Sequence, residues 1–426
     1  MTRATRRTPA TTRATTAATT RATTAATTPE PAAAAARCVP DLAAFAREHW
    51  GRAPGLWPGV DPAGYRDLLG IDDVDALIAG AGLRFPAVKV VRGGRKIGAG
   101  EYTAGATIGG VRVDDLVDPE AVRAAFAGGA TIVLSSLHRY WPPLERFCRA
   151  LEEALSHPVQ VNAYVTPAGA RGLDLHWDTH DVFVLQCFGE KHWRVHGEGF
   201  RAPLRHQHRS GAIAAEGEAL IETVLRPGDC LYVPRGFVHG AETDAAASAH
   251  LTIGVLTHSW VDVLRGVLGA MEDSPELREA LPVGFADDPA AVAELAREKL
   301  GVLADLVAQA DGEALVARVA ERAGRRLPPR VEGQIASIAR LGRLSDASVL
   351  RSAQAWRLDA RDGRVTVATG TRVLRLPARV EPALRLIARG EPFALGDLAP
   401  WLDQAGRTTL ATRLVREGLL EDGRRG

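Results

Sequence analysis

The chain has 426 residues, which is enough for more than one domain, because single domains usually run to roughly 100–200 residues. Its 52 Lys and Arg against 51 Asp and Glu leave a formal charge of +1, which excludes a global basic field and leaves only local patches for nucleic-acid or membrane binding. No run approaches the roughly 18 apolar residues of a membrane span. Four scattered cysteines without a CxxC pair indicate a reducing compartment, so we expect a cytoplasmic protein.

Residues 1–37 repeat Thr, Ala and Arg, with Glu30 as the one acid and no large apolar residue beyond Met1. Because such a segment lacks the side chains that drive burial, we expect a disordered leader. Its Arg-rich composition resembles a mitochondrial transit peptide, but without leucine or aromatic residues it has no amphipathic face.

From residue 38 to about residue 155, helical patterns alternate with short β-like runs. We expect helices in DLAAFAREHW, DPEAVRAAFAGG and PPLERFCRALEEAL, and strands in AVKVVRGG and TIVLSS. This alternation predicts an α+β lead-in.

Residues 158–260 are β-rich, with Gly, Pro and Asp turns between short apolar runs. The runs are PVQVNAYVTP, HDVFVLQCFG, HWRVHG, TVLRPGDCLYVP and HLTIGVL. Many short strands without intervening helices predict a sandwich or barrel. We therefore assign residues 38–260 to one domain, a mainly β core with its α+β lead-in.

The pattern after Trp260 is helical, with Ala, Leu and Val at helical spacing in VDVLRGVLGAMED, PAAVAELAREKLGVLADLVAQ and EALVARVAERAG. We assign residues 261–335 to a helical segment. Residues 340–426 end in PALRLIARG, LGDLAPWLD and RTTLATRLVREGLL, three expected helices after a short strand pair, which look like a small winged-helix module.

Winged helices often bind DNA through a basic recognition helix, so the charges of the last run matter. Its arginines are offset by nearby acids: Arg407, Arg413 and Arg416 stand against Glu417, Glu421 and Asp422. We therefore expect this module to serve domain interaction rather than nucleic-acid contact.

The central motif is His176-Trp177-Asp178 entering an apolar strand-like run, followed about 60 positions later by His239 in RPGDCLYVPRGFVHG. Residues two apart on an extended strand share a face, so one strand can direct an imidazole and a carboxylate at one point. Two histidines and one carboxylate leave three positions open on a metal, the facial triad of non-haem iron(II) oxygenases. The alternative is a buried His176–Asp178 pair with His239 as a surface turn residue.

Other histidines have suitable spacing. His180 shares the face of His176 and Asp178 if the strand stays regular, and His206 and His208 form another pair. The latter two lie in a polar stretch between Arg205 and Arg209, where cationic repulsion disfavours a metal ion and a solvated loop is the ordinary expectation.

Lys191 is one of four lysines in an arginine-dominated chain, and it lies one hairpin beyond the HxD motif. It can form a salt bridge with the distal carboxylate of 2-oxoglutarate. The alternative is an exposed hairpin residue paired with Glu190, and spacing alone leaves both interpretations open.

NAYVTP (162–167), HWDTHDVFVLQCFGEKHWRVH (176–196), RPGDCLYVPRGFVHGAET (226–243) and HLTIGV (250–255) resemble the JmjC oxygenases of the ribosomal-oxygenase branch. The resemblance implies a double-stranded β-helix, a cupin-like jelly roll, followed by a helical dimerisation segment and a winged-helix domain. It also implies a homodimer.

Carried over by position, the resemblance implies that His176, Asp178 and His239 bind Fe(II) and that Lys191 binds the C5 carboxylate of the co-substrate 2-oxoglutarate, with O2 as the oxidant. Asn162 and Thr252 would be further co-substrate contacts. For Asn162 the alternative is a strand residue bonding a turn backbone, and for Thr252 it is β-branched packing. Tyr164 and Trp193 are interpreted as core residues.

Three functions follow as hypotheses. The first is a hydroxylase acting on a His or Arg side chain of a ribosomal protein. The second keeps the iron chemistry but acts on a small molecule, a peptide natural product or an N-methyl group, with demethylation as the result. The third is a metal-bound scaffold without activity, whose winged helix binds DNA.

Overall fold

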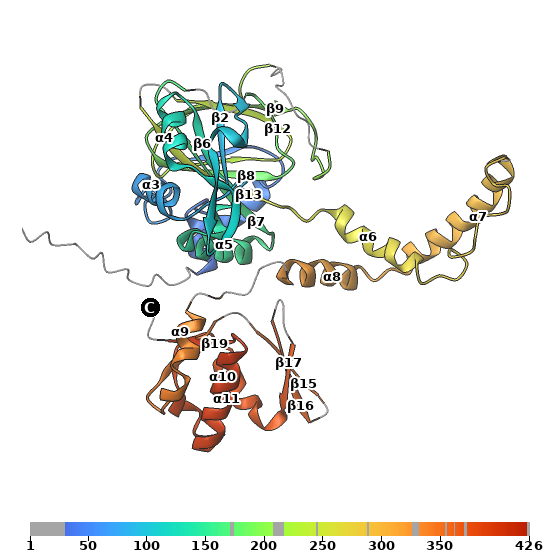
Figure 1. The fold of residues 1–426 in the computed structure, drawn as a ribbon. Helices are drawn as coiled ribbons and strands as arrows, with labels where there is room; N and C mark the ends of the chain where they lie inside the picture. Colours follow the sequence, from blue (N-terminus) through green and yellow to red (C-terminus); the bar gives the residue numbers. More distant parts are fainter. Residues whose placement is uncertain are drawn as a thin grey trace, which may run out of the picture.

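A computed structural model describes residues 30–170, 174–207, 217–243, 246–287, 289–325, 331, 333–353, 356–361, 363–369 and 373–423. Figure 1 shows a β core with its lead-in, an arm of helices that reaches away from that core, and a C-terminal unit of helices and small sheets. Within the described residues, no helix combines the length and apolarity needed to cross a membrane.

The lead-in helices are α1 (Pro31–Ala36), α2 (Leu42–Glu48), α3 (Ile71–Gly80), α4 (Pro119–Ala127) and α5 (Pro142–Leu155). The predictions for α2, α4 and α5 are confirmed. Helix α1 corrects the expected leader of residues 1–37: Ala34 and Ala35 are buried and α1 contacts α5. Small alanine side chains let two helices approach closely, so burial here needs no large apolar residue. Residues 1–29 lie outside the described residues.

The described residues up to Val255 form thirteen strands, of which eleven build the two core sheets and two form a separate hairpin. They are β1 (Gly55–Trp57), β2 (Val88–Arg92), β3 (Arg95–Lys96), β4 (Thr103–Ile108), β5 (Val111–Val117), β6 (Thr131–Leu134), β7 (Val159–Thr166), β8 (Asp181–Phe188), β9 (Lys191–Glu198), β10 (Ile221–Leu225), β11 (Cys230–Val233), β12 (Phe237–Glu242) and β13 (Ser248–Val255). An eight-stranded sheet runs β1-β11-β8-β13-β7-β6-β2-β3, and a three-stranded sheet runs β10-β9-β12. Each predicted run overlaps a strand, and TVLRPGDCLYVP covers parts of both β10 and β11.

Alternating side chains of β8 serve two hydrophobic cores, as a strand buried on both faces requires. Val182 and Val184 pack between the two sheets with Trp193 and Val195 of β9. Phe183 and Leu185 face the other way, into the larger cluster that also holds side chains of α5. The two sheets thus enclose an interior, and the expected jelly roll is confirmed.

The arm consists of α6 (Trp260–Met271), α7 (Pro289–Ala308) and α8 (Gly312–Arg325). Helix α6 contacts both α7 and α8 but buries little of itself. Trp260 is 75% exposed, Leu264 56% and Leu268 53%. The arm therefore presents large apolar side chains to its surroundings, and Figure 1 shows it reaching away from the core.

The C-terminal unit has its own hydrophobic cluster, separate from the β core. Its elements are α9 (Gln334–Ala339), β14 (Val349–Ser352), β15 (Arg357–Arg361), β16 (Arg364–Ala368), β17 (Val373–Pro377), α10 (Glu381–Ile387), β18 (Phe393–Ala394), α11 (Gln404–Arg416) and β19 (Leu420–Asp422). The expected helix in LGDLAPWLD is only a 3-10 helix, Leu395–Leu398. Pro400 has no amide hydrogen and cannot donate the next helical hydrogen bond, which disfavours continuation of this element.

A tight turn at Gly236 joins β11 to β12. Its amide donates to the carbonyl of Asp178 at 2.9 Å, and its carbonyl accepts from Gly199 at 2.8 Å. Gly236 has φ +85°, and a Cβ there would lie 1.8 Å from the carbonyl oxygen of Phe200. Only glycine fits this conformation and this close approach.

We predict that Gly236→Ala destabilises the protein more than Gly129→Ala does. Gly129 has nearly the same φ, +87°, but nothing within 4 Å of its Cβ position, so it isolates the conformational cost of about 1–2 kcal/mol. Thermal unfolding of both variants measures the difference. Equal losses of Tm would mean that the Phe200 carbonyl moves aside freely.

Candidate metal centre

His176 and Asp178 lie in the extended stretch just before β8, whereas His239 is the third residue of β12. The HxD motif was expected on the strand itself, but β8 begins only at Asp181, after both ligands. His176 forms an isolated antiparallel bridge with His239: each amide donates to the other's carbonyl, at 3.1 and 2.8 Å. This pairing holds the first and third candidate ligands side by side.

The three side chains converge. One ligand atom from each of His176, Asp178 and His239 lies within 4.8 Å of the others. No other group of three His, Cys, Asp or Glu residues in the described part of the chain converges in this way. The His239 Nε2 is 3.7 Å from an Asp178 carboxylate oxygen, and the two imidazole centroids are 4.5 Å apart. The alternative of His239 as a surface turn residue is wrong, because its side chain is buried.

Backbone carbonyls orient both imidazoles. The Nδ1 of His176 lies 2.8 Å from the Asp174 carbonyl, and the Nδ1 of His239 lies 3.0 Å from the Phe237 carbonyl. A carbonyl only accepts, so each Nδ1 must carry the proton and each Nε2 keeps its lone pair. This is the tautomer that a metal-binding histidine requires.

The electrostatics favour unprotonated ligands. Burial lowers the pKa of His239 to about 4, and the neighbouring His176 adds to the effect. Burial opposes ionisation of Asp178, but His180, His239 and His176 together keep the pKa of its carboxyl below the usual value. At neutral pH the cluster therefore offers a neutral His239 imidazole and an ionised Asp178 carboxylate.

His180 and His206 do not belong to the converging group, although His180 is near enough to Asp178 to lower the pKa of its carboxyl. His180 packs over Gly254 of β13, where a Cβ would come within 2.5 Å of the imidazole. The bend before β8 breaks the regular alternation that would have placed it beside Asp178. His206 is exposed, and His208 lies outside the described residues.

Lys191 lies inside the barrel, 2% exposed, and its ammonium donates to the Thr166 hydroxyl at 3.0 Å. The alternative pairing with Glu190 is wrong, because Glu190 forms an ion pair with Arg226. Burial lowers the pKa of Lys191 to about 7. A buried cation without a carboxylate partner among the described residues is a costly arrangement, which an anionic ligand would relieve.

Asn162 and Thr252 pair across β7 and β13. The Asn162 Oδ1 accepts the Ser136 amide at 3.0 Å, so the alternative of a strand residue bonding a turn backbone holds for its oxygen. The Thr252 hydroxyl donates to the Asn162 carbonyl at 3.5 Å. Both side chains share the strand face that carries Tyr164 and Thr166.

The interior also contains residues that sequence reasoning placed only in the core. Tyr164 stacks on His250 at 5.2 Å with an interplanar angle of 3°, and Trp193 meets the same imidazole edge-on at 5.4 Å. A hydrogen bond to Thr252 opposes the rise in the Tyr164 pKa that burial and Asp178 cause. The regular alternation of NAYVT and HLT is the sequence pattern that places these residues on one face.

Asp181 is a second residue that sequence reasoning missed, and it anchors the turn before His239. The buried carboxylate of Asp181 accepts the Tyr232 hydroxyl at 2.6 Å and the Arg235 amide at 3.0 Å. It ties the start of β8 to the turn that precedes His239. An acid at the start of an apolar strand run was the available signal, because a buried carboxylate must find such donors.

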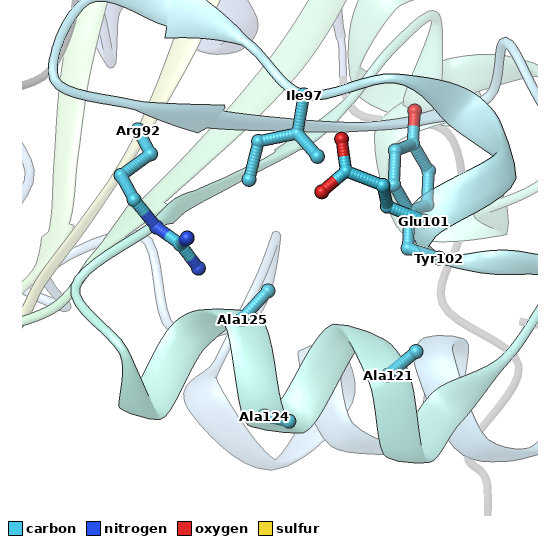
Figure 2. A pocket seen from close by; sticks show the side chains of 7 residues that line it. All are labelled: Arg92, Ile97, Glu101, Tyr102, Ala121, Ala124 and Ala125. Carbon is cyan, nitrogen blue, oxygen red and sulfur yellow. The ribbon is translucent and has the colours of Figure 1, made fainter.

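Figure 2 shows a hollow in the lead-in that includes none of these residues. Its volume is about 350 Å³, Arg92 and Glu101 stand at opposite ends, and Ile97 faces the alanines of α4 across it.

Comparison with known proteins places the site in context. Residues 134–263 match the JmjC domain family. The chain is 33% identical to chicken (Gallus gallus) ribosomal oxygenase 1 over 248 residues, covering 56% of this chain and 40% of that protein. It is 35% identical to mouse (Mus musculus) ribosomal oxygenase 2 over 215 residues, covering 48% of this chain and 46% of that protein. The chain thus spans less than half the length of these relatives.

A solved structure shares the fold: YcfD, a ribosomal oxygenase from Escherichia coli, in complex with cobalt and succinic acid. The TM-score is 0.50 at 16% identity, with 90% of this chain and 98% of that chain covered. The candidate cluster lies within the matched JmjC segment. Residues 134–263 of this chain are therefore similar to the JmjC domain, and about half of the chain resembles the ribosomal oxygenases.

Proposed function

We propose that this protein is an Fe(II)- and 2-oxoglutarate-dependent oxygenase in which His176, Asp178 and His239 hold the metal. The observation that carries the proposal is the convergence of two Nε2 atoms and one carboxylate, with both Nδ1 protons held by carbonyls. This donor set fits the 2-His-1-carboxylate triad, which leaves coordination positions for a co-substrate and O2. The names of the relatives and the cobalt and succinic acid bound by YcfD agree with it.

The protein's own contribution is to hold the ligands in place. Bound iron would supply the activation of O2 that side chains alone cannot provide. The His176–His239 bridge and the Asp181 anchor fix the two ligand segments relative to each other before any metal binds. Preformed geometry of this kind lowers the cost of ordering the ligands on binding.

We assign the distal carboxylate of 2-oxoglutarate to Lys191, with Thr166 beside it. A charge-assisted hydrogen bond in a dry interior is worth more than one at the surface. Asn162 and Thr252 stand on the neighbouring strands of the same interior and complete the proposed co-substrate contacts. The amide nitrogen of Asn162 is the donor for this role, because its oxygen already accepts Ser136.

The proposed substrate is a ribosomal protein, a choice that rests on the names of the relatives. That the side chain is a His or an Arg is part of the proposal and follows from the resemblance described above. A small molecule, a peptide natural product or an N-methyl group is the second candidate, because the chemistry at the metal would be the same. The alternative of a DNA-binding scaffold has less support. The Arg407 guanidinium is buried against Asp346 at 2.7 Å, and Arg413 pairs with Glu417 at 2.8 Å, so helix α11 does not present a free basic face.

We further propose the division into a catalytic domain of residues 38–260, a dimerisation segment of 261–335 and a winged-helix-like domain of 340–426. The apolar side chains exposed on the arm support the second of these, because large apolar patches mark interaction sites. We propose that a second copy of this chain covers them.

Turnover tests the metal site. We predict that the iron-loaded protein forms succinate from 2-oxoglutarate and O2 without a further substrate, and that His176→Ala lowers this rate at least about 100-fold through loss of a ligand. His206→Ala, at an exposed histidine, is the matched control and should keep full activity. A wild-type protein that neither retains iron nor consumes 2-oxoglutarate would sink the proposal.

Proton uptake tests Lys191. With a pKa of about 7, the lysine is mostly neutral at pH 8 in the free protein, and a bound carboxylate restores its charge. We predict that 2-oxoglutarate binding to the manganese-loaded protein takes up nearly one proton at pH 8 and almost none at pH 6. Calorimetry in buffers of different ionisation enthalpy measures this. Lys191→Met should abolish the uptake and Lys96→Met, at an exposed lysine, should not; equal uptake in both would contradict the assignment.

From the exposed apolar side chains of the arm, we predict that the protein is a homodimer in solution. The pair Leu264→Glu and Leu268→Glu places two charges on the exposed face of α6, and we expect it to convert a dimer to a monomer. Glu272→Lys, at an exposed residue just after the helix, changes charge without removing apolar surface and should leave the dimer intact. Light scattering after size exclusion gives the mass; a monomeric wild type at micromolar concentration would refute the prediction.

A further inference from the structure

The three-stranded sheet β15-β16-β17 of the C-terminal unit has two chemically opposite faces. Val365 and Val367 of β16 are buried, and Leu374 and Leu376 of β17 pack against the same hydrophobic cluster. Because side chains alternate along a strand, the residues between them lie on the outer face. One face of the sheet is therefore part of the core, and the other faces away from it.

Arginines dominate the outer face. Arg361 of β15 is directly opposite Arg364 of β16, and Arg375 of β17 is opposite Thr366, which lies two residues from Arg364. Directly opposite residues have Cβ atoms about 5 Å apart and diagonal ones about 7–8 Å apart. All three arginines are exposed. The sheet thus holds three guanidinium groups in one compact array.

The array is not neutralised within the described part of the chain. Asp359 pairs with Arg361 at 3.1 Å, but both side chains remain mostly exposed, so the pair is weak. Arg364 and Arg375 form no ion pair with another described residue. Like charges directly opposite each other destabilise a sheet, so this placement costs stability and brings no internal gain.

Charge is also segregated along the sequence of this unit. Residues 357–377, which make up the three strands and their turns, contain five arginines and two acids, whereas residues 381–423 contain five arginines and seven acids. A chain with a formal charge of only +1 therefore has a strongly basic sheet beside a slightly acidic helical half. A chain with so little net charge attracts a polyanion only through a local basic patch, and this sheet is such a patch.

We propose that the outer face of β15-β16-β17 binds the phosphate backbone of single-stranded RNA. Guanidinium groups bind phosphate oxygens through paired hydrogen bonds. A three-stranded sheet does not fit the major groove of a duplex, which admits a helix or a two-stranded ribbon. Exposed single-stranded backbone is common in RNA, whereas DNA is ordinarily paired. The surface is separate from the proposed metal centre, and the proposal does not depend on the oxygenase chemistry.

The binding is expected to be independent of base sequence. The described residues of the outer face include no aromatic side chain on which a base can stack. Phosphate contacts position a nucleic acid but carry no sequence information, and their strength falls steeply with salt. The surface therefore acts as an electrostatic tether that raises the local concentration of an RNA-bound partner.

The test uses the full chain and a fluorescent 20-nucleotide poly(U) RNA, with anisotropy measured from 50 to 200 mM salt. We expect Arg364→Glu with Arg375→Glu to weaken binding at least tenfold at low salt. The slope of log affinity against log salt should fall by about 1.4, because each lost phosphate contact on a single strand contributes about 0.7. Both side chains are exposed, so thermal unfolding should stay within a few degrees of wild type.

The matched control is Arg413→Glu with Arg416→Glu, which makes the same change in net charge on helix α11. This variant should weaken binding less than twofold. Equal loss in the two variants would overturn the proposal, because a general charge effect would then explain binding. It would also be overturned by an absence of wild-type binding at 50 mM salt, by tighter binding of oligo(dT), or by more effective displacement with polyglutamate than with unlabelled poly(U).

Discussion

The backbone exchange between His176 and His239 is the interaction on which the candidate site depends. Two hydrogen bonds of 3.1 and 2.8 Å join a segment before β8 to the start of β12, over a sequence separation that no local propensity can bridge. The Asp181 carboxylate reinforces it by holding the Arg235 amide, and Gly236 reinforces it by donating to Asp178. These contacts are backbone or backbone-anchored, so they fix positions more firmly than flexible side chains would.

The barrel interior places apolar and polar side chains side by side. Val182, Val184, Trp193 and Val195 form an apolar cluster between the sheets. The Trp193 ring joins this cluster to the polar residues, because its centroid lies 6.3 Å from that of His239 and 5.4 Å from that of His250. Burial lowers the pKa values of Lys191 and His239, so the same dryness that stabilises the fold sets the protonation states of the site. Packing and chemistry here have one physical cause.

Two regions outside the barrel contain features that destabilise the isolated chain. Exposed Trp260, Leu264 and Leu268 on the arm leave apolar surface in water, and Arg361 and Arg364 repel each other across a sheet. Neither feature stabilises the single chain. A partner that covers the apolar side chains of the arm would remove the first cost, and an anionic partner that neutralises the arginines would remove the second.

The sequence by itself determined the local elements and the chemistry of the motif. Period-two runs such as VQVNAYVT became β7, and the HxD and distal histidine supplied a donor set whose meaning is intrinsic to the residue types. Helix α1 was missed, because Ala34 and Ala35 gain burial only from the approach of α5. Only the tertiary structure ruled out the exposed pairing of Lys191 with Glu190, since burial and the Thr166 contact come from strands far apart in sequence. It likewise left His180 outside the converging group, because a bend before β8 breaks the alternation on which the spacing argument relied. Spacing describes neighbours along the chain, whereas burial and protonation depend on neighbours in space.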